Sequence, residues 1–372
     1  MGLIRKNKKN DIYAGWDEIS SGIYKWKWCM KNFFYVLLSA FCIGCTDVEN
    51  AIKLNDIQTT FDEFPLVDSL EFIPFSDSLL EEPSNMFISN DMLLIQTFCR
   101  AQDTYLSVFS LDENRIIRDI VKRGGGPNEM LSCEMGLMDN QLWLYDISKK
   151  RVGIAPIDSF VLSENPDIAW HELSHGYYNT AMLNDSIFLG TNDFESKLKI
   201  NFVNLFSGEF FERGNYSYLD SSIDLGALID ACTCYADVNP VTKDILLSYR
   251  YTDVIEIYDS KGNIKHALQG PANFAPKFHI RSKHGMGKTP ETRKAFVNTY
   301  VTENYIYLLY SGCKRTERNW PYGNEIFVYS WDGKPQKKYV LPQFVYTFAV
   351  DESKGIIYSY SRQTEELVKA VM

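Results

Sequence analysis

The chain has 372 residues, of which 45% are hydrophobic and 14% aromatic, so it can bury the core of one large domain or of two smaller ones. Tyr and Phe occur 23 times each and suit the half-buried positions of β-strands. The formal net charge of −10 disfavours binding to phosphate backbones, so we expect no nucleic-acid partner.

The N-terminal region predicts export. An apolar run of eleven residues, 33–43, follows Met30 and Lys31 and ends at Gly44-Cys45. It is too short to span a bilayer, which takes about 20 residues as a helix, and has the size of a signal-peptide core. The small residue before Cys45 resembles the lipobox of bacterial lipoproteins. We therefore expect residues 1–44 to be a signal region with its true start at Met30, and Cys45 to be lipidated; an uncleaved apolar segment is the alternative.

Removal of residues 1–44 would leave 31 basic and 45 acidic residues, a net charge of −14. The cysteines beyond Cys45 are odd in number and scattered, which is not the pattern of a disulfide framework. We expect them to be buried free thiols. They are Cys99, Cys133, Cys232, Cys234 and Cys313.

The expected location is the outer membrane, on its periplasmic or its outer side, with membrane contact through the lipid alone. Asp47 and Glu49 resemble the acidic export signals of surface lipoproteins. Residues 45–62 read as a polar tether, and the folded domain is expected over residues 63–372.

Beyond the tether, short apolar runs separated by turn residues recur in six units of up to about 50 residues. The units cover about residues 83–123, 132–157, 180–213, 235–270, 296–341 and 345–372. Repeated units of strands and tight turns predict an all-β, six-bladed β-propeller. The last unit lacks a fourth strand, which the isolated run Phe64–Phe75 would supply to close the ring. A pair of β-sandwiches is the alternative fold.

Turn residues support the strand pairing. Three turns fall between the third and fourth strands of a unit, where a hairpin needs positive φ. They are Ser207-Gly208, Lys261-Gly262-Asn263 and Asp332-Gly333.

Four features together resemble the TolB-like six-bladed propeller lipoproteins of Bacteroidetes. They are Cys45, the run Leu66–Phe75, the Gly-Pro loop Arg123–Glu129 and the closing segment Ser361–Glu365. The resemblance covers nearly all of the chain beyond Phe64, although Asn128 stands where members have a glycine. It implies a fold and a location in the cell envelope, and no particular activity.

Two motifs look catalytic and have simpler interpretations. The segment His171–His175 matches the HExxH pattern of zinc proteases, with Glu195 as a distant third ligand, but that chemistry needs a helix and the neighbours read as strands. The loop Arg123–Glu129 is glycine-rich but lacks the Lys-Ser/Thr ending of a phosphate-binding loop. We expect a chance match for the first, and for the second a tight crossing between blades, with contact to a ligand as the alternative.

Basic residues follow the second strand of most units and occupy the crossings between units, which lie on the same face of a propeller. One long crossing holds Lys277, His279, Arg281, Lys283, His284, Lys288, Arg293 and Lys294. This pattern predicts a basic face around the central channel that attracts anions; loop charges that are merely solvated are the alternative. The candidate ligand-binding residues are Arg100, Lys122, Arg123, Arg250, Arg281, Arg315 and Arg362.

The sequence favours a binding or scaffold module over an enzyme. The expected partner is a protein or an anionic or glycan ligand on the basic face, and no cofactor is expected. The alternative is a hydrolase or lactonase with a metal, such as calcium, at the channel mouth. Its oxygen ligands would be Asp146, Asn192, Asp193 and Asp253.

Overall fold

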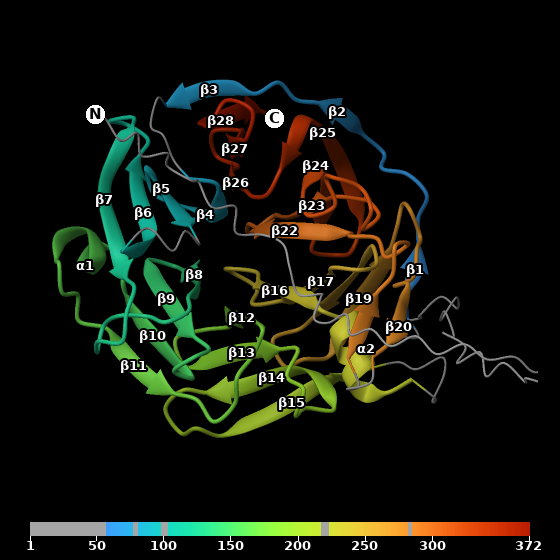
Figure 1. Ribbon diagram of the computed structural model, residues 1–372, viewed down its shortest axis with the longest axis horizontal. Coiled ribbons are helices and arrows are strands. Elements are labelled where there is room, and N and C mark those ends of the chain that lie inside the picture. The colour runs from blue at the N-terminus through green and yellow to red at the C-terminus, as the bar shows by residue number, and fades with distance from the viewer. Residues whose placement is uncertain (1–56, 77–80, 98–102, 217–222, 282–284) are drawn as a thin grey trace, which may run out of the picture. The chain divides into compact units, whose positions relative to one another are not determined.

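The computed structural model describes residues 57–76, 81–97, 103–216, 223–281 and 285–372. Cys45 and Arg100 lie outside these residues, as do Lys283 and His284. Six sheets of four or five strands surround a central channel, which confirms the all-β six-bladed propeller (Figure 1).

The first three blades follow one another along the chain, each beginning with its innermost strand. The first contains β4 (Pro83–Ser89), β5 (Met92–Thr97), β6 (Thr104–Ser110) and β7 (Arg115–Lys122). The second contains β8 (Glu134–Met138), β9 (Gln141–Asp146), β10 (Arg151–Pro156) and β11 (Ala169–Glu172), with helix α1 (Ile157–Leu162) before the last strand. The third contains β12 (Asn179–Met182), β13 (Ile187–Thr191), β14 (Leu198–Asn204) and β15 (Phe210–Asn215).

The other blades follow helix α2 (Leu225–Ala231). The fourth contains β16 (Cys234–Val238), β17 (Ile245–Tyr249), β18 (Val254–Tyr258) and β19 (Ile264–Gln269). A short hairpin of β20 (Phe278–Ile280) and β21 (Met286–Lys288) leads to the fifth, with β22 (Phe296–Val301), β23 (Tyr305–Tyr310), β24 (Gly323–Ser330) and β25 (Pro335–Val345). The sixth contains β26 (Phe348–Asp351), β27 (Ile356–Ser361) and β28 (Glu366–Val371).

The N-terminal segment forms a belt along the outer edges of the last three blades. Strand β1 (Thr59–Thr60) pairs in parallel with β19, β2 (Val67–Ser69) pairs in parallel with β25, and β3 (Ile73–Ser76) completes the sixth blade beside β28. Closure of the last blade by an N-terminal strand is thus confirmed. The expected single strand Phe64–Phe75 is instead two strands, because its first half extends the fifth blade before the chain reaches the sixth. Thr59–Thr60, expected in the tether, is already part of the sheet.

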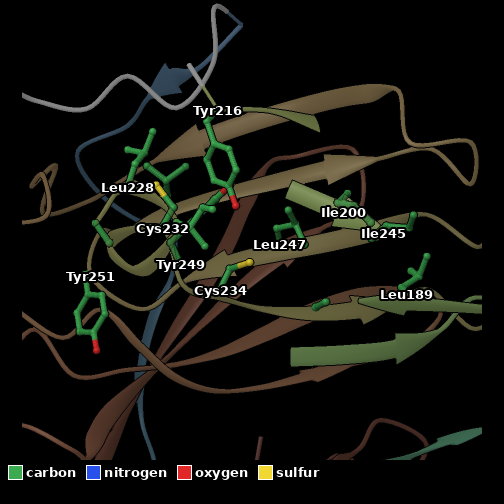
Figure 2. Packing of buried hydrophobic residues seen from close by; sticks show 14 of the residues in the cluster. Leu189, Ile200, Tyr216, Leu228, Cys232, Cys234, Ile245, Leu247, Tyr249 and Tyr251 are labelled. Carbon is green, nitrogen blue, oxygen red and sulfur yellow. The ribbon is translucent and has the colours of Figure 1, made fainter. Parts of the chain in front are cut away.

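Apolar side chains fill the space between neighbouring blades. Figure 2 shows the largest such cluster, where residues of the third and fourth blades pack with helix α2. Cys232 and Cys234 are buried in it as free thiols, and burial raises the pKa of each to about 12. Cys133 and Cys313 are also buried and free, so the cysteine prediction is confirmed for the described residues.

The three predicted turns lie between the third and fourth strands of their blades. Gly208, Gly262 and Gly333 have φ values of 73°, 80° and 74°, the left-handed region that glycine enters without strain. Within the described ranges, no helix is long and apolar enough to cross a membrane.

Candidate functional site

The central channel opens into a cavity of about 880 Å³. Its wall is built mainly from the innermost strands of the first five blades, β4, β8, β12, β16 and β22. Many lining side chains can form hydrogen bonds: Asn85, Gln96, Glu134, Asn179, Thr180, Asp237, Arg250, Asn298 and Thr299. A concave site with converging polar groups is the usual place for a small ligand.

Two carboxyl groups face this channel from the second and fourth blades. Burial is the main cause that raises the pKa of Glu134 to about 8 and the pKa of Asp237 to about 6. Glu134 accepts a hydrogen bond from the backbone N–H of Thr180 at 2.9 Å, and Asp237 accepts one from the Thr299 hydroxyl. At pH 7 Glu134 is therefore mainly protonated and Asp237 mainly ionised, so one donates a hydrogen bond where the other accepts.

Amide side chains connect the inner strands around the channel. The Asn298 amide donates to Asn85 Oδ1 at 3.4 Å, and Thr347 Oγ1 donates to Asn298 Oδ1 at 3.3 Å. Gln96 Nε2 donates to the carbonyl oxygen of Cys133 at 2.8 Å. These bonds hold the polar lining in one arrangement before any ligand arrives.

Arg250 lies at the end of the channel where the crossings between blades meet. It follows β17, and its Cζ lies 5.4 Å from the centre of the Tyr235 ring. Its Nε is buried and has no hydrogen-bond partner, and no carboxylate within the described ranges forms an ion pair with it. Arg250 is thus a fixed positive charge facing the cavity.

The other predicted basic residues do not converge on the channel. The Arg123 guanidinium lies 3.6 Å from the centre of the Tyr105 ring and donates to the carbonyl oxygens of Thr104 and Thr97. Lys122 is exposed beside a separate groove between the first two blades. Their role in binding stays a prediction.

The predicted arginines that follow the second strands of the fifth and sixth blades have other contacts. Arg315 donates to the carbonyl oxygen of Lys288 at 2.6 Å, and Arg362 pairs with Glu82 at 2.9 Å. Arg281 is exposed after β20. Of the predicted ligand-binding residues that the structure describes, Arg250 is the one that lines the cavity.

Two basic side chains that follow β9, the second strand of the second blade, hold a crossing loop in place. Lys149 Nζ donates to the carbonyl oxygens of Gly126 and Glu129 at 3.0 and 2.7 Å, and Arg151 Nη2 donates to Glu129 at 2.9 Å. The Gly-Pro loop Arg123–Glu129 joins β7 to β8, as predicted, and these bonds fix its path.

The HExxH segment is not helical. His171 and Glu172 are the last residues of strand β11, and the His171 Nδ1 lies 3.0 Å from the carbonyl oxygen of Leu205. His175 Nδ1 lies 3.3 Å from Asp193 and 3.4 Å from Glu195. A chance match is the interpretation that this geometry supports.

The four proposed metal ligands belong to three blades, and each already has hydrogen-bond donors. Asp146 accepts from the backbone N–H of Leu131 at 2.8 Å, and Asp253 accepts from that of Asn273 at 2.7 Å. Asn192 Oδ1 accepts from the Asn179 amide at 3.3 Å, and Asp193 accepts from the backbone N–H of Glu195 at 2.9 Å. Among the described residues, no three His, Cys, Asp or Glu side chains lie in a metal-binding arrangement.

The sequence interpretation missed Glu134 and Asp237. Each is an acidic residue inside a short, otherwise apolar or small-residue run at the start of a unit. That position is the innermost strand of a blade, so an acidic residue there must face either the channel or the packed core. This reasoning would have identified both.

A family model described as TolB-like 6-blade propeller-like matches residues 60–353. Among solved structures, a candidate exported protein of Bacteroides fragilis superposes with a TM-score of 0.52 at 12% identity, covering 84% of this chain and 98% of the other. A member of the DUF4221 family from Bacteroides vulgatus gives 0.49 at 13% identity, covering 82% and 98%. A streptogramin B lyase gives 0.43 at 11% identity, covering 81% and 97%. No curated protein sequence matches the chain.

Proposed function

The chain belongs to the TolB-like six-bladed propeller family, and we propose that it is an exported, lipid-anchored binding protein that holds a small polar ligand in its central channel. One observation carries the proposal. A cavity of about 880 Å³ combines Arg250 at one end with an amide-rich wall that contains Glu134 and Asp237. Its size and its mixture of donors and acceptors suit a ligand of a few rings at most.

The charges and hydrogen-bonding groups indicate the ligand class. An arginine without a carboxylate partner binds carboxylate or sulfate groups through its planar donors. The protonated Glu134, the ionised Asp237 and the amides between them match hydroxyl groups, which both donate and accept. We infer a hydroxyl-rich molecule with one acidic group, such as a sugar acid.

The location rests on other features. The lipobox-like Cys45 follows a signal-like apolar run, and the Bacteroides fragilis neighbour is described as a candidate exported protein. The first feature supports a lipid anchor in the cell envelope, and the second supports export.

Thermal unfolding of residues 46–372 in the presence of single sugars tests the proposal. The panel pairs glucose with glucuronate, and galactose with galacturonate, so that each pair differs by a carboxylate. A ligand at 100 times its Kd stabilises the fold by about 2.7 kcal/mol, a shift in Tm of a degree or more. We expect larger shifts with the acids than with the neutral sugars. Equal shifts, or none with any sugar acid, would contradict the proposal.

A second candidate function rests on the same carboxyl pair. Two carboxyl groups with separated pKa values are an arrangement used in acid–base hydrolysis, with Glu134 as acid and Asp237 as base. Turnover of chromogenic glycosides or lactones that is lost in both Glu134→Gln and Asp237→Asn would favour this function. Binding without turnover leaves the first proposal in place.

A further inference from the structure

Three basic side chains lie close together beside the channel mouth, between the fourth and fifth blades. Arg250 follows β17, Lys288 ends β21 and Lys294 precedes β22. The ammonium groups of Lys288 and Lys294 each lie 5.4 Å from the centre of the same ring, that of Tyr251. Like charges at such separations repel one another unless an anion lies near them.

This cluster contains donors that lack acceptors. Lys294 is 4% exposed, and its Nζ lies 4.6 Å from the centre of the Trp320 ring without a hydrogen-bond acceptor within the described ranges. Two further donors, the Nε of Arg250 and the indole Nε1 of Trp320, are buried atoms without a hydrogen-bond partner. Buried donors in folded proteins nearly always have partners, so unpartnered ones that occur together point to a missing acceptor.

We propose that Arg250, Lys288, Lys294 and Trp320 form a binding site for an oxyanion of the sulfate, phosphate or carboxylate class. An oxyanion offers several acceptor oxygens and at least one negative charge, which matches the unpartnered donors and the excess positive charge. The site goes beyond the proposed function, since it needs no sugar in the channel; a free ion and the acidic group of a channel ligand are the two sources of the anion.

The site couples binding to a proton. Burial first, and then the charges of Arg250 and Lys288, lower the pKa of Lys294 to about 6. A bound anion favours the ammonium form, so at pH 7.5 the protein takes up a proton as the anion binds. The other titratable groups that face the cluster are Asp230, on helix α2, and the tyrosines Tyr235, Tyr251 and Tyr346.

Calorimetric titration with sodium sulfate tests this site, because sulfate keeps its charge from pH 6 to 8. We expect the affinity for sulfate to rise by up to about tenfold per pH unit as the pH falls from 8 towards 6, and to level off below 6. Heats measured at pH 7.5 in buffers of different ionisation enthalpy should show uptake of up to one proton. Titration with glucuronate in the same buffers then shows whether a carboxylate occupies the same site.

Two variants and one matched control distinguish binding at this site from general attraction of anions to a basic surface. Lys294→Met should lose proton uptake and pH dependence, and Arg250→Gln should weaken sulfate binding at least tenfold. Arg281→Gln removes an exposed charge from the same crossing and should bind as the unaltered protein does. Because Glu134 and Asp237 also titrate between pH 6 and 8, the series is repeated in Glu134→Gln/Asp237→Asn, where the pH dependence due to Lys294 should remain.

Other results would overturn the inference. An equal loss of sulfate affinity in Arg281→Gln and Arg250→Gln would mean that anions are attracted generally to a basic surface. Sulfate binding without proton uptake would remove Lys294 from the site. If Lys294→Met fails to fold, Lys288→Met tests the site through its affinity for sulfate, because Lys288 is only partly buried; unchanged sulfate affinity in that variant would also contradict the site.

Discussion

The surroundings of the Glu134 side chain favour the neutral form of its carboxyl group. Its pKa of about 8 lies well above the usual value of 4.5, chiefly because the surrounding blades remove water from the carboxyl group. The folded state therefore binds a proton that the unfolded state releases. Ionisation costs folding free energy from about pH 4.5 upward, and this cost is complete above about pH 8.

Glu134→Gln should remove that cost. The amide keeps the oxygen that accepts the Thr180 N–H, so the variant should match the unaltered protein at pH 4.5 and become progressively more stable than it up to pH 8 or 9. Urea unfolding at pH 5, 7 and 9 measures the difference. Asp237, whose pKa is about 6, lowers the free energy of unfolding as the pH rises towards 6, and it does so in both proteins. A constant difference between the two proteins at all pH values would contradict this account.

A buried ion pair joins the third and fourth blades. Lys199 Nζ lies 2.7 and 2.9 Å from the two carboxylate oxygens of Glu256, and Tyr249 and Tyr258 donate to the same group at 2.6 and 2.7 Å. Both charged side chains are almost completely buried. Loss of the lysine would leave a buried carboxylate without its cation.

Lys199→Met should therefore lower the free energy of unfolding by about 3–5 kcal/mol. The additional change Glu256→Gln should restore part of this, because the amide still accepts hydrogen bonds from the tyrosines without carrying a charge. Lys337→Met is the matched control: its ion pair with Asp68 is half exposed and contributes about 0–1 kcal/mol. Equal losses in the two lysine variants, measured by urea unfolding, would contradict the assignment.

Whether a binding residue could be predicted from the sequence depended on the direction of its side chain. Arg250 and Arg151 both follow the second strand of a blade, so the same sequence pattern identifies both. Arg250 faces the channel, whereas Arg151 is buried against Trp170, with its Cζ 3.7 Å from the centre of that ring. The sequence contains the positive charge but not the loop conformation that directs it, so the basic face was predicted and its division into separate contacts was not.

Among the elements, the belt of β1, β2 and β3 completes the sixth blade and extends the fourth and fifth. Phe64 lies between β1 and β2 and is 6% exposed; its ring centre lies 4.8 Å from that of Phe327 and 5.2 Å from that of Phe61. These contacts attach the belt to the fifth blade. The unpaired outer edges of the fourth and fifth blades are covered by β1 and β2, which limits pairing with other chains.

Phe64→Ala should destabilise the fold by about 3–5 kcal/mol, because it leaves a cavity in this aromatic cluster. Leu66→Ala, two residues further along the belt, should change stability by less than about 0.5 kcal/mol, since Leu66 is 59% exposed. Urea unfolding of both variants measures the difference. If Phe64→Ala matches Leu66→Ala, the belt does not hold the ring closed through this residue.

The sequence predicted the strand that closes the last blade, but not that two further strands pair in parallel with the outer edges of the fourth and fifth blades. Apolar alternation over Phe64–Phe75 predicts strand, and the missing fourth strand of the last unit provides its place. A parallel edge strand leaves no turn and no neighbouring partner in the sequence, so nothing local indicated β1 or the parallel pairing of β2 with the fifth blade. Asp146 and Asp253 likewise looked like metal ligands because their partners, backbone N–H groups of distant loops, carry no sequence pattern.

In the whole molecule, the number of blades could be predicted from the repeated turns. The channel, in contrast, forms only when the ring of blades closes. The innermost strands of five blades each contribute four or five residues to one cavity only when the ring is complete, so Glu134 and Asp237 line the same cavity although about 100 residues separate them. The fold was therefore predictable from local patterns. The site, which consists of contributions from five blades, was not.

The proposed ligand of the channel is rich in hydroxyl groups and has its acidic group bound at Arg250. Calorimetric titration of glucuronate into the unaltered protein, Arg250→Gln and Arg281→Gln at pH 7 tests this proposal most directly. We expect one site per chain, at least a tenfold loss of affinity in Arg250→Gln, and no change in Arg281→Gln. Absence of binding to the unaltered protein, or equal affinity in all three proteins, would contradict the account.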